Sequence, residues 1–209
     1  MMDAYANIVP ATMPVTLPAG LRSGAEEDAQ EKYWIDAADS IARKIAEGAV
    51  VAHAFANFYA ITTRADAATV RSVNLMKGRP PAQVGSIVTT REHIPELFDW
   101  SKLPAGITRT SVMALIDALY ALGPFGFRGP AAEHIPEHLS SFDDAVRTTQ
   151  VIAPGYACSC NHFLEVALKA SGATLLYVTS ANRSHHQTGA RDEPAHYLAD
   201  ALAADFAQA

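Results

Sequence analysis

Two spaced pairs of polar residues are the part of this sequence best suited to chemistry. The first pair is Lys77 and Arg79, which stand two residues apart and are followed at once by Pro80. A proline drives the residue before it toward an extended conformation, and residues i and i+2 of an extended chain point to the same side. The two cations are therefore predicted to face one anionic ligand, with arginine as a planar fork for phosphate and lysine as a point charge. The alternative is an exposed turn with two solvated cations.

The second pair is Ser180 and Asn182, at the carboxyl end of an apolar segment, Ala173–Ser180, that is predicted to be a buried strand. Open α/β sheets bind ligands at the carboxyl ends of their strands. A hydroxyl and an amide on one side of the chain suit phosphate oxygens or the edge of a nucleobase. An asparagine-containing turn that only leads out of the strand is the alternative interpretation.

Cysteine and histidine residues near position 160 raise the question of a metal. Cys158, Cys160 and His162 are close in sequence. A structural zinc site usually needs four ligands from two separated pairs, and no second pair is fixed nearby. We therefore predict no metal site and thiols that are buried or incidental. His53 stands in a predicted strand, where a histidine is more often packed in a core than used as a base.

Composition limits the class of protein. The 209 residues carry a net charge of −6, so the basic excess typical of strong nucleic-acid binders is absent overall, although a local basic cleft is compatible with this balance. No apolar run approaches the ~18 residues of a membrane span, and no secretory signal is evident. The two cysteines are one residue apart, which suits reduced thiols. These features predict a cytoplasmic protein without a membrane partner.

The elements that must position these residues follow from periodicity and punctuation. Residues 1–28 contain three prolines without a period and are predicted to form a flexible tail, and residues 29–209 form one domain. The segment Ala121–Pro130 is rich in glycine and proline and is predicted to be a ligand-facing turn or a loop. The expected helices cover Gln30–Glu47, Asp66–Met76, Thr110–Leu122, Cys160–Ser171 and Pro194–Ala207, and the expected strands cover Ala49–Phe55, Gly85–Thr90 and Ala173–Ser180. Helices interleaved with apolar strands predict an α/β domain.

Taken in order, these segments resemble the YrdC family of threonylcarbamoyl-AMP synthases, from about Trp34 to Phe206. The resemblance rests on a K-x-R-P run at Lys77, a G-P turn at Gly123, an S-x-N run at Ser180 and the segment "HAFANFYAI". It implies a twisted open sheet of mixed parallel and antiparallel strands, with flanking helices and a concave cavity.

The resemblance also implies an activity. Members of the family use ATP with Mg²⁺, bicarbonate and threonine to make a carbamoyl-adenylate for the modification of adenosine 37 in tRNA, together with downstream tRNA-modification enzymes. By this resemblance the nucleotide is bound by Lys77, Arg79, Ser180 and Asn182. The substrate pocket is formed by His53, Phe55, Asn57 and Tyr59. No catalytic residue is assigned.

Several positions depart from the family pattern. Phe55 and Asn57 replace two hydroxyl residues of its Y-P-T-x-T run, Gly126 replaces a threonine and His185 replaces a glycine. Ile152 replaces an arginine of its R-x-P run, for which Arg147 is a candidate stand-in.

Three interpretations stay open. The chain is an enzyme for threonine or a related amine, a non-catalytic protein that binds a nucleotide or double-stranded RNA, or a structural module with an unused cleft. The retained phosphate-facing set favours a phosphate ligand in the first two.

Overall fold

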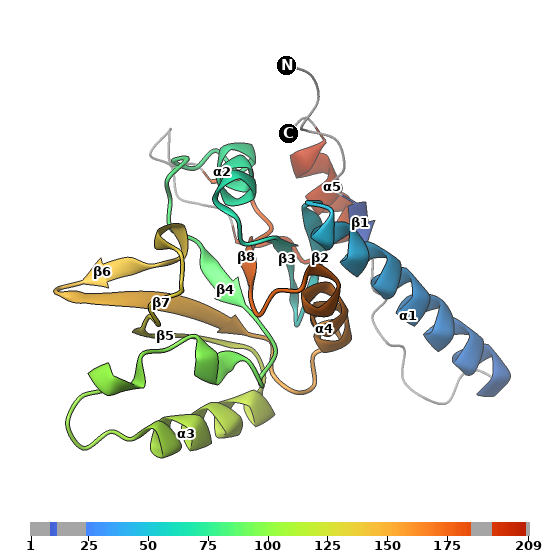
Figure 1. Ribbon diagram of the computed structural model, residues 1–209. Coiled ribbons are helices and arrows are strands. Elements are labelled where there is room, and N and C mark those ends of the chain that lie inside the picture. Colours follow the sequence, from blue (N-terminus) through green and yellow to red (C-terminus); the bar gives the residue numbers. More distant parts are fainter. Residues whose placement is uncertain (1–8, 12–23, 185–193, 208–209) are drawn as a thin grey trace.

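A mixed, open sheet of eight strands forms the centre of the molecule (Figure 1). The computed structural model describes residues 9–11, 24–184 and 194–207. The strand order is β1-β2-β3-β8-β4-β7-β5, with β6 paired to β7, and the pairs β1/β2 and β4/β7 are parallel while the others are antiparallel. The strands are β1 (Val9–Ala11), β2 (Val51–Phe55), β3 (Phe58–Thr63), β4 (Ser86–Val88), β5 (Phe125–Pro130), β6 (Ser141–Asp143), β7 (Val146–Ala153) and β8 (Leu176–Ser180).

Helices pack on both faces of this sheet. They are α1 (Gly24–Ala46), α2 (Ala67–Met76), α3 (Arg109–Leu122), α4 (Cys160–Ser171) and α5 (Ala199–Phe206), with short 3₁₀ turns at Ile94–Glu96, Trp100–Lys102 and Glu137–Leu139. One core lies between the sheet and α2, α3 and α5, and a second lies under α1 and α4. Because β-strand side chains alternate between faces, neighbouring residues such as Ala60 and Ile61 contribute to different cores. The predicted α/β class with flanking helices is confirmed.

The elements that lead to the site begin and end at the residues expected from their capping signals. Asp66 caps α2, since its Oδ1 accepts the Thr69 amide proton at 3.0 Å. The helix α4 spans the predicted residues and ends at Gly172 in the left-handed conformation, with φ 62°.

Two parts of the fold differ from the sequence prediction. The predicted turn or loop at Ala121–Pro130 is wrong over most of its length, because Phe125–Pro130 forms β5, paired to β7 from Phe125 opposite Ala153 to Pro130 opposite Thr148. Phe125 and Phe127 point to the core while Gly126 and Arg128 are exposed, an alternation typical of a strand. The strands β3, β6 and β7 were not predicted from periodicity.

The N-terminal segment also differs. The strand β1 lies inside the stretch predicted to be a flexible tail and pairs with β2. The helix α1 begins at Gly24 rather than Gln30. The rest of that stretch lies outside the described residues. Among the helices that the structure describes, none is long and apolar enough to cross a membrane.

Candidate functional site

The carboxyl end of β8 is where the two predicted polar pairs meet. The Lys77 side chain is buried, with 0% of its surface exposed, and its ammonium group donates a hydrogen bond to the carbonyl oxygen of Ser180. The guanidinium Nη1 of Arg79 donates to the Thr179 hydroxyl at 2.7 Å. The two cations therefore contact successive residues of one strand end, although they come from the end of α2, about a hundred residues earlier in the chain. Their role in nucleotide binding stays a prediction.

The S-x-N run forms a closed turn beyond the strand. The Ser180 hydroxyl donates to Oδ1 of Asn182 at 2.6 Å, and Nδ2 of Asn182 donates to the Arg183 carbonyl at 3.1 Å. The Asn182 side chain is 3% exposed, so it fixes the turn from inside. Ser180 lies on the pocket surface, whereas Asn182 lies behind it.

Gly78 explains why a glycine separates the two cations. Its φ is 72°, in the left-handed region, and a Cβ atom there would lie 3.1 Å from the carbonyl oxygen of Ser184. The Ser184 amide donates to the Lys77 carbonyl at 2.7 Å, so the chain after β8 packs directly on the cation loop. A side chain at position 78 would therefore be strained by the positive φ and would crowd the Ser184 carbonyl.

Asn74 is a positioning residue that the sequence analysis missed. Its side chain is 1% exposed, and its Nδ2 donates to the Gln83 carbonyl at 2.8 Å. Its own carbonyl accepts the Arg79 amide proton at 2.8 Å. A buried asparagine near the end of an amphipathic helix is the signal that could have indicated this role, since buried polar groups are hydrogen-bonded. Through these bonds α2 sets the course of the Arg79–Gln83 loop.

A pocket of about 360 Å³ opens beside this strand end. Among the lining residues that the structure describes, Arg79 carries the charge, and apolar groups from Phe55, Phe58, Ile152 and Val178 form part of the wall. The lining residues are Phe55, Phe58, Ala60, Arg79, Gln83, Val84, Gly85, Ser86, Gln150, Ile152, Tyr177, Val178, Thr179 and Ser180. The wall is thus mixed, because polar side chains from Ser86, Gln150 and Thr179 lie beside the apolar ones and Arg79 adds a cation.

Tyr177 and Gly85 shape one side of the pocket. A Cβ atom on Gly85 would lie 2.3 Å from the ring carbon Cε2 of Tyr177, so the ring requires a glycine there. Burial raises the pKa of the Tyr177 phenol, which keeps the hydroxyl neutral. The sequence did not indicate that Gln83–Ser86 and Gln150 line the pocket. They come together through the pairing of β4 with β8 and β7, which joins segments far apart in the chain.

The four predicted pocket residues separate in the structure. Phe55 lines the pocket. Tyr59 is buried in the core under α5, and Asn57 is exposed in the turn between β2 and β3. Neither of these two is among the lining residues, and neither is His53. The described lining of the pocket therefore includes one of the four, and their assignment to a single substrate pocket stays a prediction. His53 lies on the same face of β2 as Phe55, whereas Tyr59 belongs to the core on the other face of the sheet.

His53 is a core histidine. Its Nε2 lies 2.8 Å from the Thr62 hydroxyl, its Nδ1 lies 3.0 Å from the Ala54 carbonyl, and its ring packs on Phe163 at 4.7 Å between centroids. Burial lowers the pKa of His53 to about 4, so the imidazole is neutral at physiological pH.

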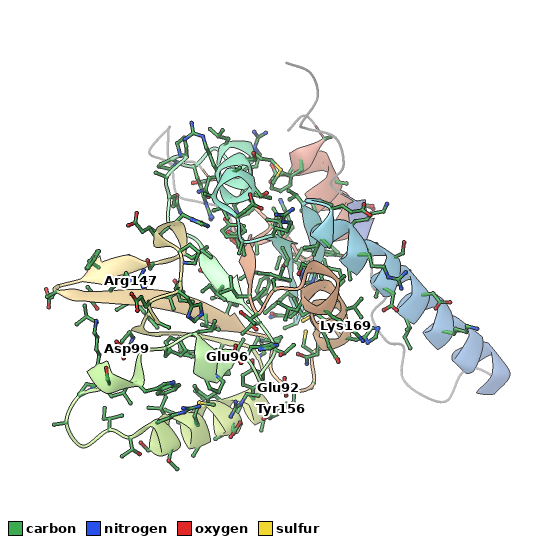
Figure 2. The ribbon with its side chains drawn as sticks, in the orientation of Figure 1. Glu92, Glu96, Asp99, Arg147, Tyr156 and Lys169 are labelled. Carbon is green, nitrogen blue, oxygen red and sulfur yellow. The ribbon has the colours of Figure 1, made fainter. Side chains whose placement is uncertain are left out.

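Two of the departures from the family pattern, Phe55 and Ile152, line the pocket. Ile152 lies where the resemblance predicts an arginine, and it lines the pocket. Arg147 does not stand in for that arginine. Its guanidinium donates to the carbonyls of Ala132, Ile135 and Glu133 at 2.6, 2.8 and 2.9 Å, and it lies on the part of β7 that pairs with β6 (Figure 2). His185 lies outside the described residues.

Of the three residues considered as metal ligands, Cys158 and Cys160 lie side by side, whereas Nε2 of His162 pairs with Oδ1 of Asp39 at 2.8 Å. Within the described part of the chain, no group of three or more histidine, cysteine, aspartate or glutamate residues is placed to hold a metal ion.

Comparisons with known proteins point to one fold. No protein-family model and no curated protein matches the sequence. Among solved structures, P. abyssi Sua5 complexed with L-threonine matches with a TM-score of 0.59 and 21% identity, over 83% of this chain and 44% of that chain. A doubly substituted variant of P. abyssi Sua5 gives 0.57 and 20%, over 84% and 44%. E. coli YciO gives 0.50 and 12%, over 70% and 64%.

These similarities show a YrdC-like fold, as the sequence predicted. This chain spans less than half the length of the Sua5 chains that it matches.

Proposed function

We propose that this chain is a nucleotide-dependent enzyme of the YrdC type. In this proposal it uses ATP, bicarbonate and an amine, threonine or a related compound, to make a carbamoyl-adenylate for the modification of adenosine 37 in tRNA, which downstream modification enzymes then use. One observation carries the proposal. In a YrdC-like fold, Arg79 and Ser180 line one side of a pocket while Lys77 and Asn182 hold that side in place from behind.

The phosphate end of the ligand is assigned to Arg79. Its guanidinium group is the charged group among the described lining residues. Arginine binds phosphate through parallel hydrogen bonds, and such charge-assisted bonds are roughly twice as strong as those between neutral groups. Lys77 acts through the strand end, since its ammonium group fixes the Ser180 carbonyl rather than the pocket surface.

Mg²⁺ fits this site as part of the nucleotide rather than as a protein-bound ion. No aspartate or glutamate is among the described lining residues. Mg²⁺ usually keeps several waters and is held largely by substrate phosphates, so oxygen ligands from the triphosphate meet its needs. When bound, the ion shares the charge of the triphosphate, and Arg79 neutralises the part that faces the protein.

The reaction needs two bonds to form in sequence. The amine nitrogen attacks the carbon of bicarbonate, and water leaves to give a carbamate. A carbamate oxygen then attacks the α-phosphorus of ATP, and pyrophosphate leaves. The pocket contributes mainly by holding these groups together and by neutralising charge.

The amine end of the pocket argues for a substrate other than threonine itself. P. abyssi Sua5 was crystallised with L-threonine, which supports an amino acid as the class of ligand. In this chain Ile152 and Phe55 line the pocket where the resemblance predicts an arginine and a hydroxyl. A carboxylate that loses a charge-assisted hydrogen bond loses about 1.5–3 kcal/mol of binding. A related amine without that carboxylate, or with more apolar surface, fits this wall better.

The same wall favours a second candidate function. If the amine end is no longer a binding site, the chain is a non-catalytic protein that binds a nucleotide or double-stranded RNA through Arg79. The net charge of −6 argues against RNA as the main ligand, because phosphate neutralisation dominates RNA affinity.

Pyrophosphate release distinguishes the two functions. The full chain is incubated with ATP, Mg²⁺ and bicarbonate, and each amino acid or small amine is added in turn. The enzyme proposal predicts release that depends on one amine and is lost in Arg79→Ala but kept in Arg71→Ala, an exposed arginine on α2 outside the pocket lining. ATP binding without release for any amine would leave the binding protein.

A further inference from the structure

A pair of thiols at the start of α4 has no part in the function proposed above. The Sγ atoms of Cys158 and Cys160 lie 2.6 Å apart, and these are the two cysteines of the sequence. Both are free thiols. They lie outside the pocket lining, with Cys158 on the segment that connects β7 to α4 and Cys160 at the first residue of α4.

The loop that carries the thiols is held rigidly. The side-chain amide of Asn161 donates to the carbonyls of Gly155, Tyr156 and Cys158 at 2.9, 3.2 and 3.0 Å. Gly155 has φ 78°, and a Cβ atom there would lie within 2.6–2.8 Å of the backbone of Gly123. These contacts fix the approach to α4, so the two sulfurs stay close without a covalent bond.

The two thiols differ in access. Cys160 is 0% exposed and belongs to the core under α4. Cys158 is partly exposed, and its neighbours Tyr156 and Ser159 are exposed. Tyr156 lies where the end of α3 approaches the start of α4 (Figure 2). A small reagent from solvent therefore reaches Cys158 first, and Cys160 can be reached only by its neighbour.

They also differ in acidity. The hydrogen bond from the Cys160 thiol lowers the pKa of Cys158 to about 6, and the backbone amides of Ala56 and Cys160 add to this, although burial opposes it. The hydrogen bond to the adjoining Cys158 sulfur, together with burial, raises the pKa of Cys160. At neutral pH the accessible sulfur is the thiolate, and the buried sulfur keeps its proton.

We propose that Cys158 and Cys160 form a redox-active dithiol that a hydroperoxide oxidises to an intramolecular disulfide. Cys158 is the attacking thiol, because its sulfur is both accessible and stabilised by donors from the turn at Ala56 and from the first residue of α4. Cys160 is the resolving thiol, because it lies in contact with Cys158 and away from solvent.

The chemistry balances in two steps. The Cys158 thiolate attacks the terminal oxygen of the hydroperoxide, which carries the hydrogen, the O–O bond breaks, and the departing alkoxide takes a proton from solvent to leave as an alcohol. Cys158 is then a sulfenic acid. The Cys160 sulfur attacks the Cys158 sulfur, the S–O bond breaks, and the hydroxyl leaves as water with the Cys160 proton. One dithiol and one hydroperoxide give one disulfide, one alcohol and one water, a two-electron oxidation that a dithiol reductant reverses.

The geometry permits the bond. Ser159 has helical dihedral angles, φ −62° and ψ −16°. With helical geometry at the intervening residue, the two Cα atoms stay within the range that a disulfide spans. The sulfurs are already in contact, so closing the bond needs a small shift of Cys158 at the exposed end of the loop.

The test uses the reduced full chain and one equivalent of hydrogen peroxide. We expect both free thiols to disappear together, the intact mass to fall by two hydrogens, and dithiothreitol to restore both thiols. In Cys160→Ser the reaction is expected to stop at a sulfenic acid that dimedone captures. In Cys158→Ser the remaining thiol is expected to stay free, because it is buried and protonated. Circular dichroism checks that each variant is folded.

The pH dependence separates this mechanism from ordinary oxidation. Between pH 7 and pH 9 the thiolate fraction of an ordinary cysteine with a pKa near 8.5 rises about 25-fold, whereas that of a thiol with a pKa near 6 changes by less than about twofold. We therefore expect a flat rate of oxidation over this range in the wild type. Covalent dimers, a gain of oxygen without loss of the second thiol, or two thiols that survive the peroxide would each overturn the proposal.

Discussion

Restoring an arginine at position 152 tests the assignment of the amine end most sharply. Ile152 lies on β7, lines the pocket, and stands opposite Gly126 of β5. A Cβ atom on Gly126 would lie 3.2 Å from Cδ1 of Ile152, so the glycine leaves room above this side chain. In the Ile152→Arg variant, the longer side chain is expected to pass over Gly126 and extend along the pocket wall toward a bound carboxylate.

The expected gain follows from the lost hydrogen bond. A charge-assisted bond to a carboxylate is worth about 1.5–3 kcal/mol, which corresponds to about a 10- to 150-fold tighter binding of threonine. Arg79 lies on the same pocket, and repulsion between the two cations places the expected gain at the lower end when no nucleotide is bound.

The assay is calorimetric titration of threonine with a non-hydrolysable ATP analogue present. Ile152→Met keeps the apolar wall and is expected to leave the affinity unchanged. Ile152→Lys adds a point charge without the fork and is expected to give a smaller gain. Equal affinities in all four folded proteins would show that position 152 does not face the carboxylate, and the assignment of the amine end would be wrong.

Three further predictions concern the parts that hold the site together. Burial lowers the pKa of His53 from 6.5 to about 4, so the unfolded chain binds a proton that the folded chain does not as pH falls from 6.5 to 4, and about 3 kcal/mol of stability is lost over that window. The free energy of unfolding of His53→Gln in urea should depend less on pH. An equal dependence on pH in the variant and the wild type would contradict the core assignment. Gly78→Ala and Gly106→Ala both place alanine at positive φ, and each should lower the free energy of unfolding by about 1–2 kcal/mol. Only Gly78→Ala, whose new Cβ atom contacts Ser184, should also weaken nucleotide binding. Asn74→Ala should lower the free energy of unfolding by about 1–3 kcal/mol, because it leaves the Gln83 carbonyl without its hydrogen-bond donor. This variant should also lose more nucleotide affinity than the control Ser72→Ala, which changes an exposed residue of the same helix.

The parts of the fold that were predicted have local signals. The helix α2 begins at a capping aspartate, α4 ends at a glycine, and the strand before Ser180 is continuously apolar. These features depend on residues within one turn or one strand. The parts that were missed depend on partners far along the chain. The strand β5 contains glycine and proline residues and becomes a strand because β7 pairs with it.

The candidate site shows the same division. Spacing alone indicated that Lys77 and Arg79 act together, and the structure brings both to β8. Spacing could not show that Lys77 is buried behind the strand end while Arg79 reaches the pocket, since this depends on how α2 packs on the sheet. His53 was assigned to the pocket by resemblance, and spacing could not show that its ring is buried against Phe163, on the same face of β2 as Phe55.

The measurement that tests the central claim most directly is the binding of a non-hydrolysable ATP analogue with Mg²⁺, followed by calorimetry in the wild type, Arg79→Ala and the control Arg71→Ala. We predict saturable binding in the wild type and the control, and a loss of about 1.5–3 kcal/mol, roughly 10- to 150-fold in affinity, in Arg79→Ala. Equal binding in all three proteins, or no binding in the wild type, would contradict the claim that the end of β8 and the Arg79 loop form a nucleotide site.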